Sequence, residues 1–195
     1  MATLLHIKTS LFGDHGQSAQ LAKSFVDTWH AENSDGVVIE RDLASDPVPH
    51  LDAYRVTALN SPAEERDADQ SAVVEFADAL LAEVKSADTI VIGLPMYNFN
   101  IPSQLKSWFD HLARAGVTFH YTEQGPVGLI EDKPVYLVAT RGGLYAEQGQ
   151  DFQVDFVKQF LGFIGLKDTR LVLAEGLAMD THRDQSLEQA RAAFV

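Results

Sequence analysis

One loop of this chain carries an unusual set of side chains. Positions 95–100 read Pro-Met-Tyr-Asn-Phe-Asn, so two aromatic rings, two amides and a thioether lie within six residues. Pro95 and Pro102 stiffen this loop, because the proline ring fixes φ. The rings offer flat stacking surfaces and the amides offer hydrogen-bond donors and acceptors. The loop therefore suits a flat ring rich in heteroatoms, with a flavin as the first candidate; a plug at the edge of the core is the alternative.

A second loop, residues 10–18, offers neutral hydrogen-bond donors. Ser10, Gln17 and Ser18 carry hydroxyl and amide groups, and a helix that begins near Gln17 exposes main-chain N–H groups at its start. Such donors predict a site for an anion such as a phosphate monoester, with no need for Lys or Arg. The loop has neither the GxGxxG nor the Walker spacing. The alternative is that both serines serve only as turn and N-cap residues.

A third loop reads Thr140-Arg141-Gly142-Gly143 and follows a buried apolar run. Paired glycines let the main chain come close to a ligand and present N–H groups to it. A plain turn is the alternative for this loop taken alone. The three loops together favour a ligand site more strongly than any one of them does, because a phosphate site, an aromatic loop and a glycine platform occur in one chain.

The elements that must position these loops alternate along the chain. Apolar runs predict strands at 3–9, 37–43, 89–94, 135–140 and 169–174, and helical spacing predicts helices at 17–32, 71–86, 102–115, 152–164 and 185–194. Five strands alternating with helices predict an α/β fold: a flavodoxin-like three-layer sandwich whose parallel sheet has the order 2-1-3-4-5 and helices on both faces.

In that order the loops after the first, third and fourth strands meet at one crevice, where ligands of open α/β sheets bind. The loops at 10–18, 95–100 and 140–143, called the three chemical loops below, follow these three strands.

Two stretches depart from the alternation. Residues 117–130 resemble a short hairpin-like excursion, and about 25 residues after position 43 lack strong periodicity, which often marks a functional or interface loop.

Composition restricts the class of protein. The chain has 195 residues, 46% of them apolar, which suits a single domain spanning 1–195. No apolar run approaches the length of a membrane span and the first residues do not resemble a signal peptide, so a cytoplasmic location is expected. A net charge of −13 disfavours nucleic-acid and anionic-membrane partners. The absence of cysteine excludes thiol chemistry, and no histidine spacing suggests a metal site.

Five segments resemble the FMN-dependent NADH:azoreductases, a family of flavodoxin-like quinone and azo-dye reductases. They are Pro-Met-Tyr-Asn-Phe-Asn-Ile at 95–101, Ala-Arg-Ala-Gly-Val-Thr-Phe at 113–119, Tyr-Thr-Glu at 121–123, Arg-Gly-Gly at 141–143 and Phe-Leu-Gly-Phe-Ile-Gly at 160–165. The similarity runs nearly from end to end, and the aromatic loop is its most specific mark.

The resemblance implies a set of residues that bind FMN: Ser10, Gly16, Gln17, Ser18, Pro95, Met96, Tyr97, Asn98, Phe99, Thr140, Arg141, Gly142 and Gly143. The residues of the first loop would hold the phosphate, the aromatic loop would flank the isoalloxazine, and Asn98 would face its pyrimidine edge. Gly16 stands where the family has a serine. We therefore expect weaker retention of FMN here.

The resemblance also implies a homodimer with Phe119 near the active site. His120 and Asn60 stand where relatives can carry arginine. Both differences remove positive charge from the expected substrate mouth, so sulfonated azo dyes should be poorer substrates than neutral ones.

The implied reaction is two-electron, ping-pong hydride transfer from NADH or NADPH to a quinone or azo compound. The flavin supplies the chemistry, so no side chain is an obligatory catalyst. His120 is the candidate proton donor, with a solvated surface histidine as the alternative. The competing function is a flavodoxin-type electron carrier, whose acidic surface would suit a basic redox partner.

Overall fold

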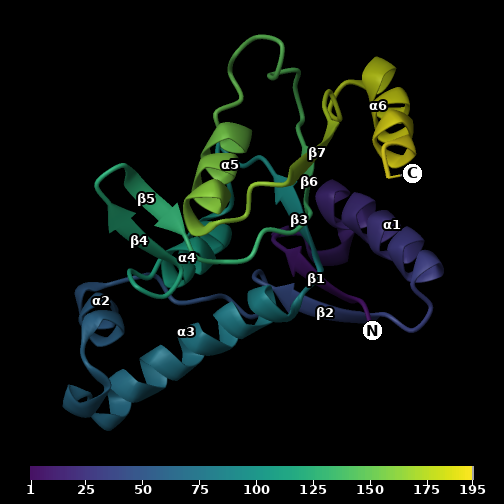
Figure 1. The fold of residues 1–195 in the computed structure, drawn as a ribbon. Helices are drawn as coiled ribbons and strands as arrows, with labels where there is room; N and C mark the ends of the chain where they lie inside the picture. Colours follow the sequence, from purple (N-terminus) through teal and green to yellow (C-terminus); the bar gives the residue numbers. More distant parts are fainter. Residues whose placement is uncertain (195) are drawn as a thin grey trace.

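A parallel sheet of five strands forms the centre of the computed structural model, which describes residues 1–194 (Figure 1). Its strands, in spatial order, are β2 (Val37–Asp42), β1 (Thr3–Lys8), β3 (Thr89–Pro95), β6 (Val135–Thr140) and β7 (Thr169–Ala174). Counted along the chain within this sheet, the order is 2-1-3-4-5. The predicted flavodoxin-like fold and strand order are therefore confirmed.

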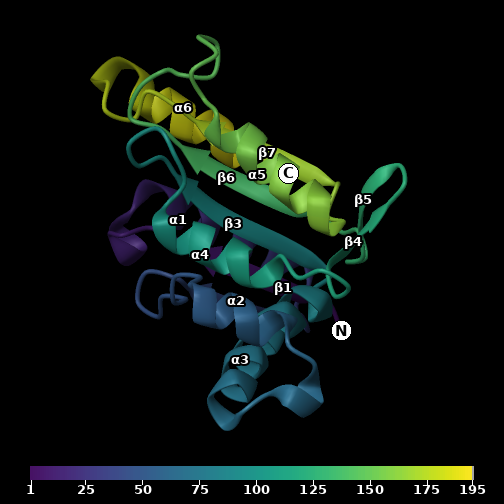
Figure 2. The ribbon, with the colours of Figure 1, turned by 90° about the vertical axis from the view of Figure 1, so that its left-hand side faces the viewer.

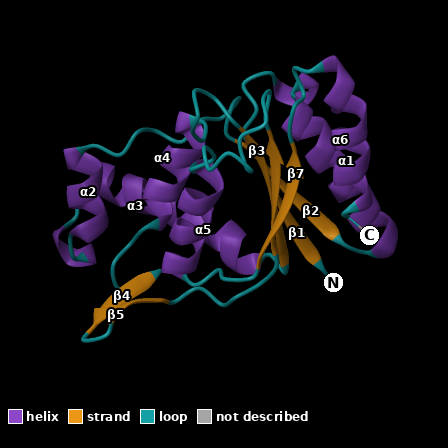
Figure 3. Cartoon of the chain, turned by 90° about the horizontal axis from the view of Figure 1, so that it is seen from above, coloured by secondary structure: helices purple, strands orange, loops and turns teal. Residues whose placement is uncertain are grey.

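Helices cover both faces of the sheet (Figures 2 and 3). One face carries α1 (Gln17–Glu32) and α6 (Asp180–Ala192), and the other carries α3 (Ala68–Ser86), α4 (Ser103–Leu112) and α5 (Gln153–Ile164). Each face has its own apolar core because successive side chains of a strand point to opposite sides. Leu4 and Val91 pack with α1, for example, whereas Leu5 and Ile90 belong to the core under α3, α4 and α5.

The stretch predicted to be irregular after residue 43 contains a helix, α2 (Ala53–Asn60), and a 3-10 turn at Ala63–Glu65, so that prediction was wrong. The Asp52 side chain caps α2 by accepting from Arg55 N at 2.8 Å. Apolar periodicity does not indicate this helix, because Ala58 is its one buried residue. Helix α3 begins at Ala68, earlier than predicted, because Asp67 and Gln70 form a capping box.

The predicted hairpin excursion is present as β4 (Phe119–Thr122) paired with the antiparallel β5 (Gly125–Gly128), and it stands away from the main sheet (Figure 1). It docks on the C-terminal end of α5. The ring centroids of Phe119 and Phe163 lie 4.2 Å apart, and Ile130 N donates to Ile164 O at 3.0 Å. The last helix also begins earlier than expected, at Asp180 instead of residue 185.

Gly128 allows the main chain of this hairpin to touch the end of α5. A Cβ atom at Gly128 would lie 2.2 Å from Gly165 N. We therefore expect Gly128→Ala to lower the free energy of unfolding by about 1–3 kcal/mol, as measured by urea denaturation. Gly162→Ala is the control, because a Cβ there meets nothing within 4 Å and alanine favours the helix. Equal stability of the two variants would contradict the tight docking.

His6 makes the stability depend on pH. Its side chain lies on β1, is 3% exposed and has Nδ1 3.7 Å from Glu40 Oε1. Burial lowers the pKa of His6 from its ordinary value, and the nearby Glu40 only partly opposes this shift. In the unfolded chain this histidine titrates at about pH 6.5, so as the pH falls the unfolded chain takes up the proton before the folded one does. The free energy of unfolding therefore decreases below that pH.

Replacing His6 by glutamine should reduce the fall in Tm on going from about pH 7 to pH 5. His30→Gln, which changes an exposed histidine on α1, serves as the control. If wild type and His6→Gln lost the same Tm over this range, His6 would not contribute to the acid sensitivity.

Candidate functional site

A cavity of about 370 Å³ lies at the carboxyl ends of the strands of the main sheet. Its lining consists of Ser10, Phe12, Gly16, Gln17, Ser18, Pro95, Met96, Tyr97, Thr140, Arg141, Gly142, Leu177, Ala178 and Arg183. The structure thus brings residues of all three chemical loops to one place. Asn98, Phe99 and Gly143 belong to these loops and do not line the cavity.

The first wall of the cavity is the start of α1, which is rich in unused donors. Gly16 is the N-cap and provides no side-chain cap, and the first helical hydrogen bond runs from Gln20 N to Gly16 O at 3.0 Å. The N–H groups of Gln17 and Ser18 have no acceptor among residues 1–194. The Ser18 hydroxyl is buried and also finds no partner within the described chain. Donors arranged in this way favour an anion.

Ser10 fills the space that a side chain at position 16 would need. A Cβ at Gly16 would lie 1.9 Å from Ser10 Oγ, which accepts from Phe12 N at 3.2 Å. A serine at position 16 therefore requires Ser10 to adopt another rotamer. The Ser10 rotamer in this structure is therefore compatible with glycine at position 16 and incompatible with a side chain there.

The aromatic loop is a tight turn with strained main chain. Tyr97 N donates to Asn100 O at 3.0 Å, and Asn100 N donates to Tyr97 O at 3.1 Å. Asn98 and Phe99 between them have φ values of 51° and 65°, which a phenylalanine rarely adopts. The Phe99 ring is 60% exposed. The Tyr97 hydroxyl accepts from Leu11 N at 3.1 Å and so ties this loop to the first one. Backbone strain of this kind is typical of functional sites.

The segment that follows β7 forms hydrogen bonds with the glycine loop. Leu177 N donates to Arg141 O at 3.0 Å, Ala178 N to Gly142 O at 3.0 Å and Gly176 N to Gly143 O at 2.9 Å. The carbonyls of this loop are thereby used. The N–H groups of Gly142 and Gly143 donate to nothing within residues 1–194 and are available to a ligand.

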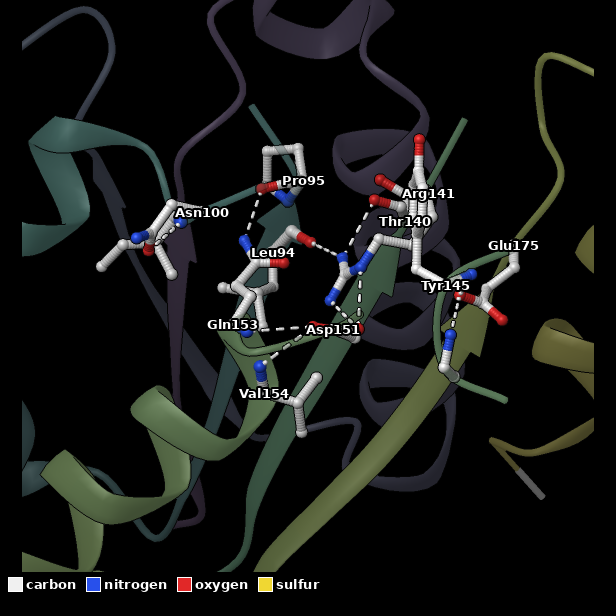
Figure 4. Close-up of polar contacts among 12 residues, drawn as sticks. Leu94, Pro95, Asn100, Thr140, Arg141, Tyr145, Asp151, Gln153, Val154 and Glu175 are labelled. Carbon is white, nitrogen blue, oxygen red and sulfur yellow. Dashed lines mark hydrogen bonds and ion pairs between the residues drawn. The ribbon is translucent and has the colours of Figure 1, made fainter. Parts of the chain in front are cut away.

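A buried ion pair connects the loops behind the cavity (Figure 4). The side chains of Arg141 and Asp151 are 0% and 7% exposed, and Nη2 lies 2.9 Å from Oδ2. Arg141 Nη1 also donates to Leu94 O at 3.1 Å and to Thr140 O at 3.0 Å. Burial lowers the pKa of Arg141 from its usual value, although Asp151 opposes this shift. The guanidinium still remains charged at neutral pH.

The same carboxylate anchors the start of α5. Asp151 Oδ1 accepts from Gln153 N at 3.0 Å, and Gln153 Nε2 donates to Pro95 O at 2.8 Å (Figure 4). Nε and Nη1 of Arg141 thus donate to Asp151 and to main-chain carbonyls, whereas the buried Nη2 lies close to Asp151 and makes no hydrogen bond within the described chain. Arg141 lines the cavity and also connects the aromatic and glycine loops, and its predicted part in cofactor binding stays a prediction.

The three residues predicted near the substrate lie apart from the cavity lining. Phe119 is buried against Phe163, and His120 is exposed on β4. Asn60 is exposed at the end of α2, where its Nδ2 donates to Val56 O at 2.8 Å. Within one chain these residues do not complete the site.

Sequence reasoning missed Phe12, Leu177, Ala178 and Arg183 in the lining. The last three follow β7, whose carboxyl end lies at the same edge of the sheet as those of β3 and β6. The sequence signal available for them was their place after a fifth parallel strand, since every loop at this edge can reach the crevice.

A doubly covered parallel sheet with a helix start rich in free donors, an aromatic turn and a glycine platform at one edge defines a flavodoxin-type cofactor-binding domain. No helix among residues 1–194 is long and apolar enough to cross a membrane, and this range holds no cluster of three potential metal-binding side chains. A family model described as a flavodoxin-like fold, Flavodoxin_2, matches residues 2–195, and the chain belongs to this family.

Similar proteins carry specific names. A protein of Cellvibrio japonicus named FMN-dependent NADH:quinone oxidoreductase is 57% identical, with 98% of this chain and 96% of its own length covered. A protein of the same name from Alcanivorax borkumensis is 51% identical, with 98% of each chain covered. The crystal structure of an FMN-dependent NADH-azoreductase from Bacillus anthracis in complex with FMN gives a TM-score of 0.88 at 28% identity, covering 100% of this chain and 98% of the other.

Proposed function

We propose that this protein is an FMN-dependent oxidoreductase that takes hydride from NADH or NADPH and reduces quinones and azo compounds by two electrons in a ping-pong sequence. The single observation that carries the proposal is the cavity in which an unused donor set, an aromatic turn and a glycine platform meet. The names of relatives at 57% and 51% identity support the same reaction.

The residues present fit FMN. The buried Ser18 hydroxyl has no partner within the described chain, and a phosphate oxygen would satisfy it together with the N–H of Gln17 and the Ser10 hydroxyl. Met96 and Tyr97 would flank the ring, and Asn98 would face its pyrimidine edge. When bound, FMN supplies the hydride and electron transfer. The N–H groups of Gly142 and Gly143 would stabilise negative charge on the reduced ring.

We further propose that the protein is a homodimer in which the β4–β5 hairpin of a second copy lies at the substrate mouth, with His120 exposed on it and Phe119 packed beneath it. The exposed apolar side chains of Phe99, Tyr121 and Phe152 support a contact surface between copies. Light scattering that returns a monomer would contradict the dimer. A cytoplasmic location belongs to the same proposal.

The decisive experiment is a visible spectrum of the purified protein with FMN, followed without oxygen by NADH and then by a benzoquinone. A perturbed flavin band that bleaches with NADH and returns with the quinone supports the proposed reaction. Bound flavin that ignores NADH would favour the electron carrier. If FMN does not bind, the proposed function is wrong.

The charge at the substrate mouth predicts a dye preference. Wild-type protein should turn over a neutral azo dye with higher kcat/KM than a sulfonated one. Asn60→Arg combined with His120→Arg should raise kcat/KM for the sulfonated dye and leave the neutral dye unchanged, because only the anionic dye gains an attraction. Steady-state kinetics with both dyes checks this, and equal gains for the two dyes would count against it.

A further inference from the structure

Arg183 is a cation in the cavity lining that the proposed function does not use. It lies in the first turn of α6, where its main-chain N–H donates to Met179 O at 3.1 Å. Figure 3 shows α6 beside α1 on one face of the sheet. The side chain of Arg183 therefore lines the same cavity as Gly16, Gln17 and Ser18 at the start of α1.

The Arg183 guanidinium has one hydrogen-bond partner within the described chain and further donors without one. Its Nη1 donates to Leu177 O at 3.1 Å, and Leu177 N in turn donates to Arg141 O at 3.0 Å. Nε and Nη2 of Arg183 donate to no atom of residues 1–194. Nη1 thus fixes the guanidinium to the loop after β7. Arg183 is exposed, so its other two nitrogens are accessible to a ligand in the cavity.

The charge of Arg183 is also unbalanced. No carboxylate of the described chain lies within 4 Å of it, whereas Arg141, the other cation in the lining, is paired with Asp151. The chain as a whole carries a net charge of −13, which repels anions. An unpaired arginine in the same cavity lining as Ser18 adds a positive charge that opposes this repulsion locally. Arginine, N–H groups and a hydroxyl together are the donor set that recognises phosphoryl oxygens.

We propose that Arg183 binds a phosphoryl group of a nucleotide in this cavity. The inference rests on the proposed function and extends it with a residue outside the three chemical loops. Two phosphoryl groups share this chemistry: the phosphate monoester of FMN and the diphosphate of NADH. A purely structural role, in which Arg183 only holds Leu177 in place, is the competing explanation.

The first arm of the test measures flavin binding to the apoprotein by fluorescence quenching, with FMN and with riboflavin, which lacks the phosphate. Arg183→Gln should weaken FMN binding about tenfold and leave riboflavin binding unchanged if Arg183 contacts the flavin phosphate. Arg191→Gln is the matched control, because it removes the same charge from the exposed far end of α6. Arg183→Lys, which keeps the charge, should retain most of the FMN affinity.

The second arm measures steady-state kinetics at saturating FMN with NADH and with N-benzyl-dihydronicotinamide, a hydride donor without phosphates. If Arg183 contacts the diphosphate, Arg183→Gln should raise KM for NADH about tenfold and leave the phosphate-free donor unchanged. Either selective loss supports the proposal and identifies the source of the phosphoryl group.

Two outcomes overturn the proposal. Equal losses for the phosphate-bearing and phosphate-free ligands would show a structural role, and no loss beyond that of Arg191→Gln would show no role. Wild-type protein that binds neither flavin would instead refute the proposed function. In that case inorganic phosphate serves as the probe: it should raise the Tm of wild type and not that of Arg183→Gln, and an equal shift would overturn the role of Arg183.

Discussion

Asp151→Asn should lower the free energy of unfolding by about 3–5 kcal/mol, because it leaves the charge of Arg141 buried and unpaired. Both side chains of the pair are almost fully buried, so water cannot replace the lost partner. Asparagine keeps the size of the side chain and one oxygen for the N–H of Gln153. The expected loss is therefore electrostatic and does not arise from a cavity. Urea denaturation of the apoprotein measures it.

Asp155→Asn is the control for this experiment, because Asp155 lies in the first turn of α5, close to Asp151 in the chain, is exposed and carries the same charge. It should change stability by no more than about 0.5 kcal/mol. A similarly small effect of Asp151→Asn would show that the Arg141 charge finds another partner or reaches water. The double variant Arg141→Met with Asp151→Leu should recover part of the stability, since no buried charge is then left unpaired.

Loss of the ion pair should also reduce FMN affinity, because Arg141 holds the carbonyls of Leu94 and Thr140 at the ends of two strands. The double variant separates the two effects. It should regain stability without regaining FMN affinity, since methionine donates no hydrogen bond to either carbonyl. Recovery of both together would show that FMN affinity follows stability alone.

The sheet and the three loops could be predicted because each depends on local signals. Runs such as Thr89-Ile90-Val91-Ile92 indicate buried strands directly, and alternation with helices leaves few sheet orders. The order in turn determines which loops meet. Ser18 and Gly142 could therefore be assigned to one cavity before any contact was known.

The parts that could not be predicted depend on tertiary contacts. Arg141 and Asp151 are ten residues apart across a loop with no regular pattern, so nothing in the sequence indicates their ion pair. The positive φ of Phe99 is an exception to the preference of its residue type, and the surrounding turn imposes it. Arg183 reaches the cavity only because α6 packs beside α1. Helix α2 is short and mostly exposed, so it lacks the periodic apolar face that predicts a helix.

Ser18→Ala should change the apoprotein and its cofactor complex in opposite directions. The Ser18 hydroxyl is buried and has no partner within residues 1–194, so its removal should raise the free energy of unfolding of the apoprotein, by up to about 1 kcal/mol. Under the proposed function, the same hydroxyl would donate to the FMN phosphate. Loss of a hydrogen bond to a charged group costs about 1.5–3 kcal/mol, so FMN should bind about 10- to 150-fold more weakly.

Urea denaturation of the apoprotein and fluorescence titration with FMN measure the two effects separately. Ser24→Ala is the control on the same helix: Ser24 Oγ donates to Gln20 O at 3.1 Å, so its hydroxyl is already satisfied. That variant should change neither quantity appreciably. A destabilised Ser18→Ala apoprotein with unchanged FMN affinity would assign the hydroxyl to the fold and contradict the phosphate site. Opposite signs cannot arise from a general loosening of α1, which would weaken the fold and the binding of FMN together.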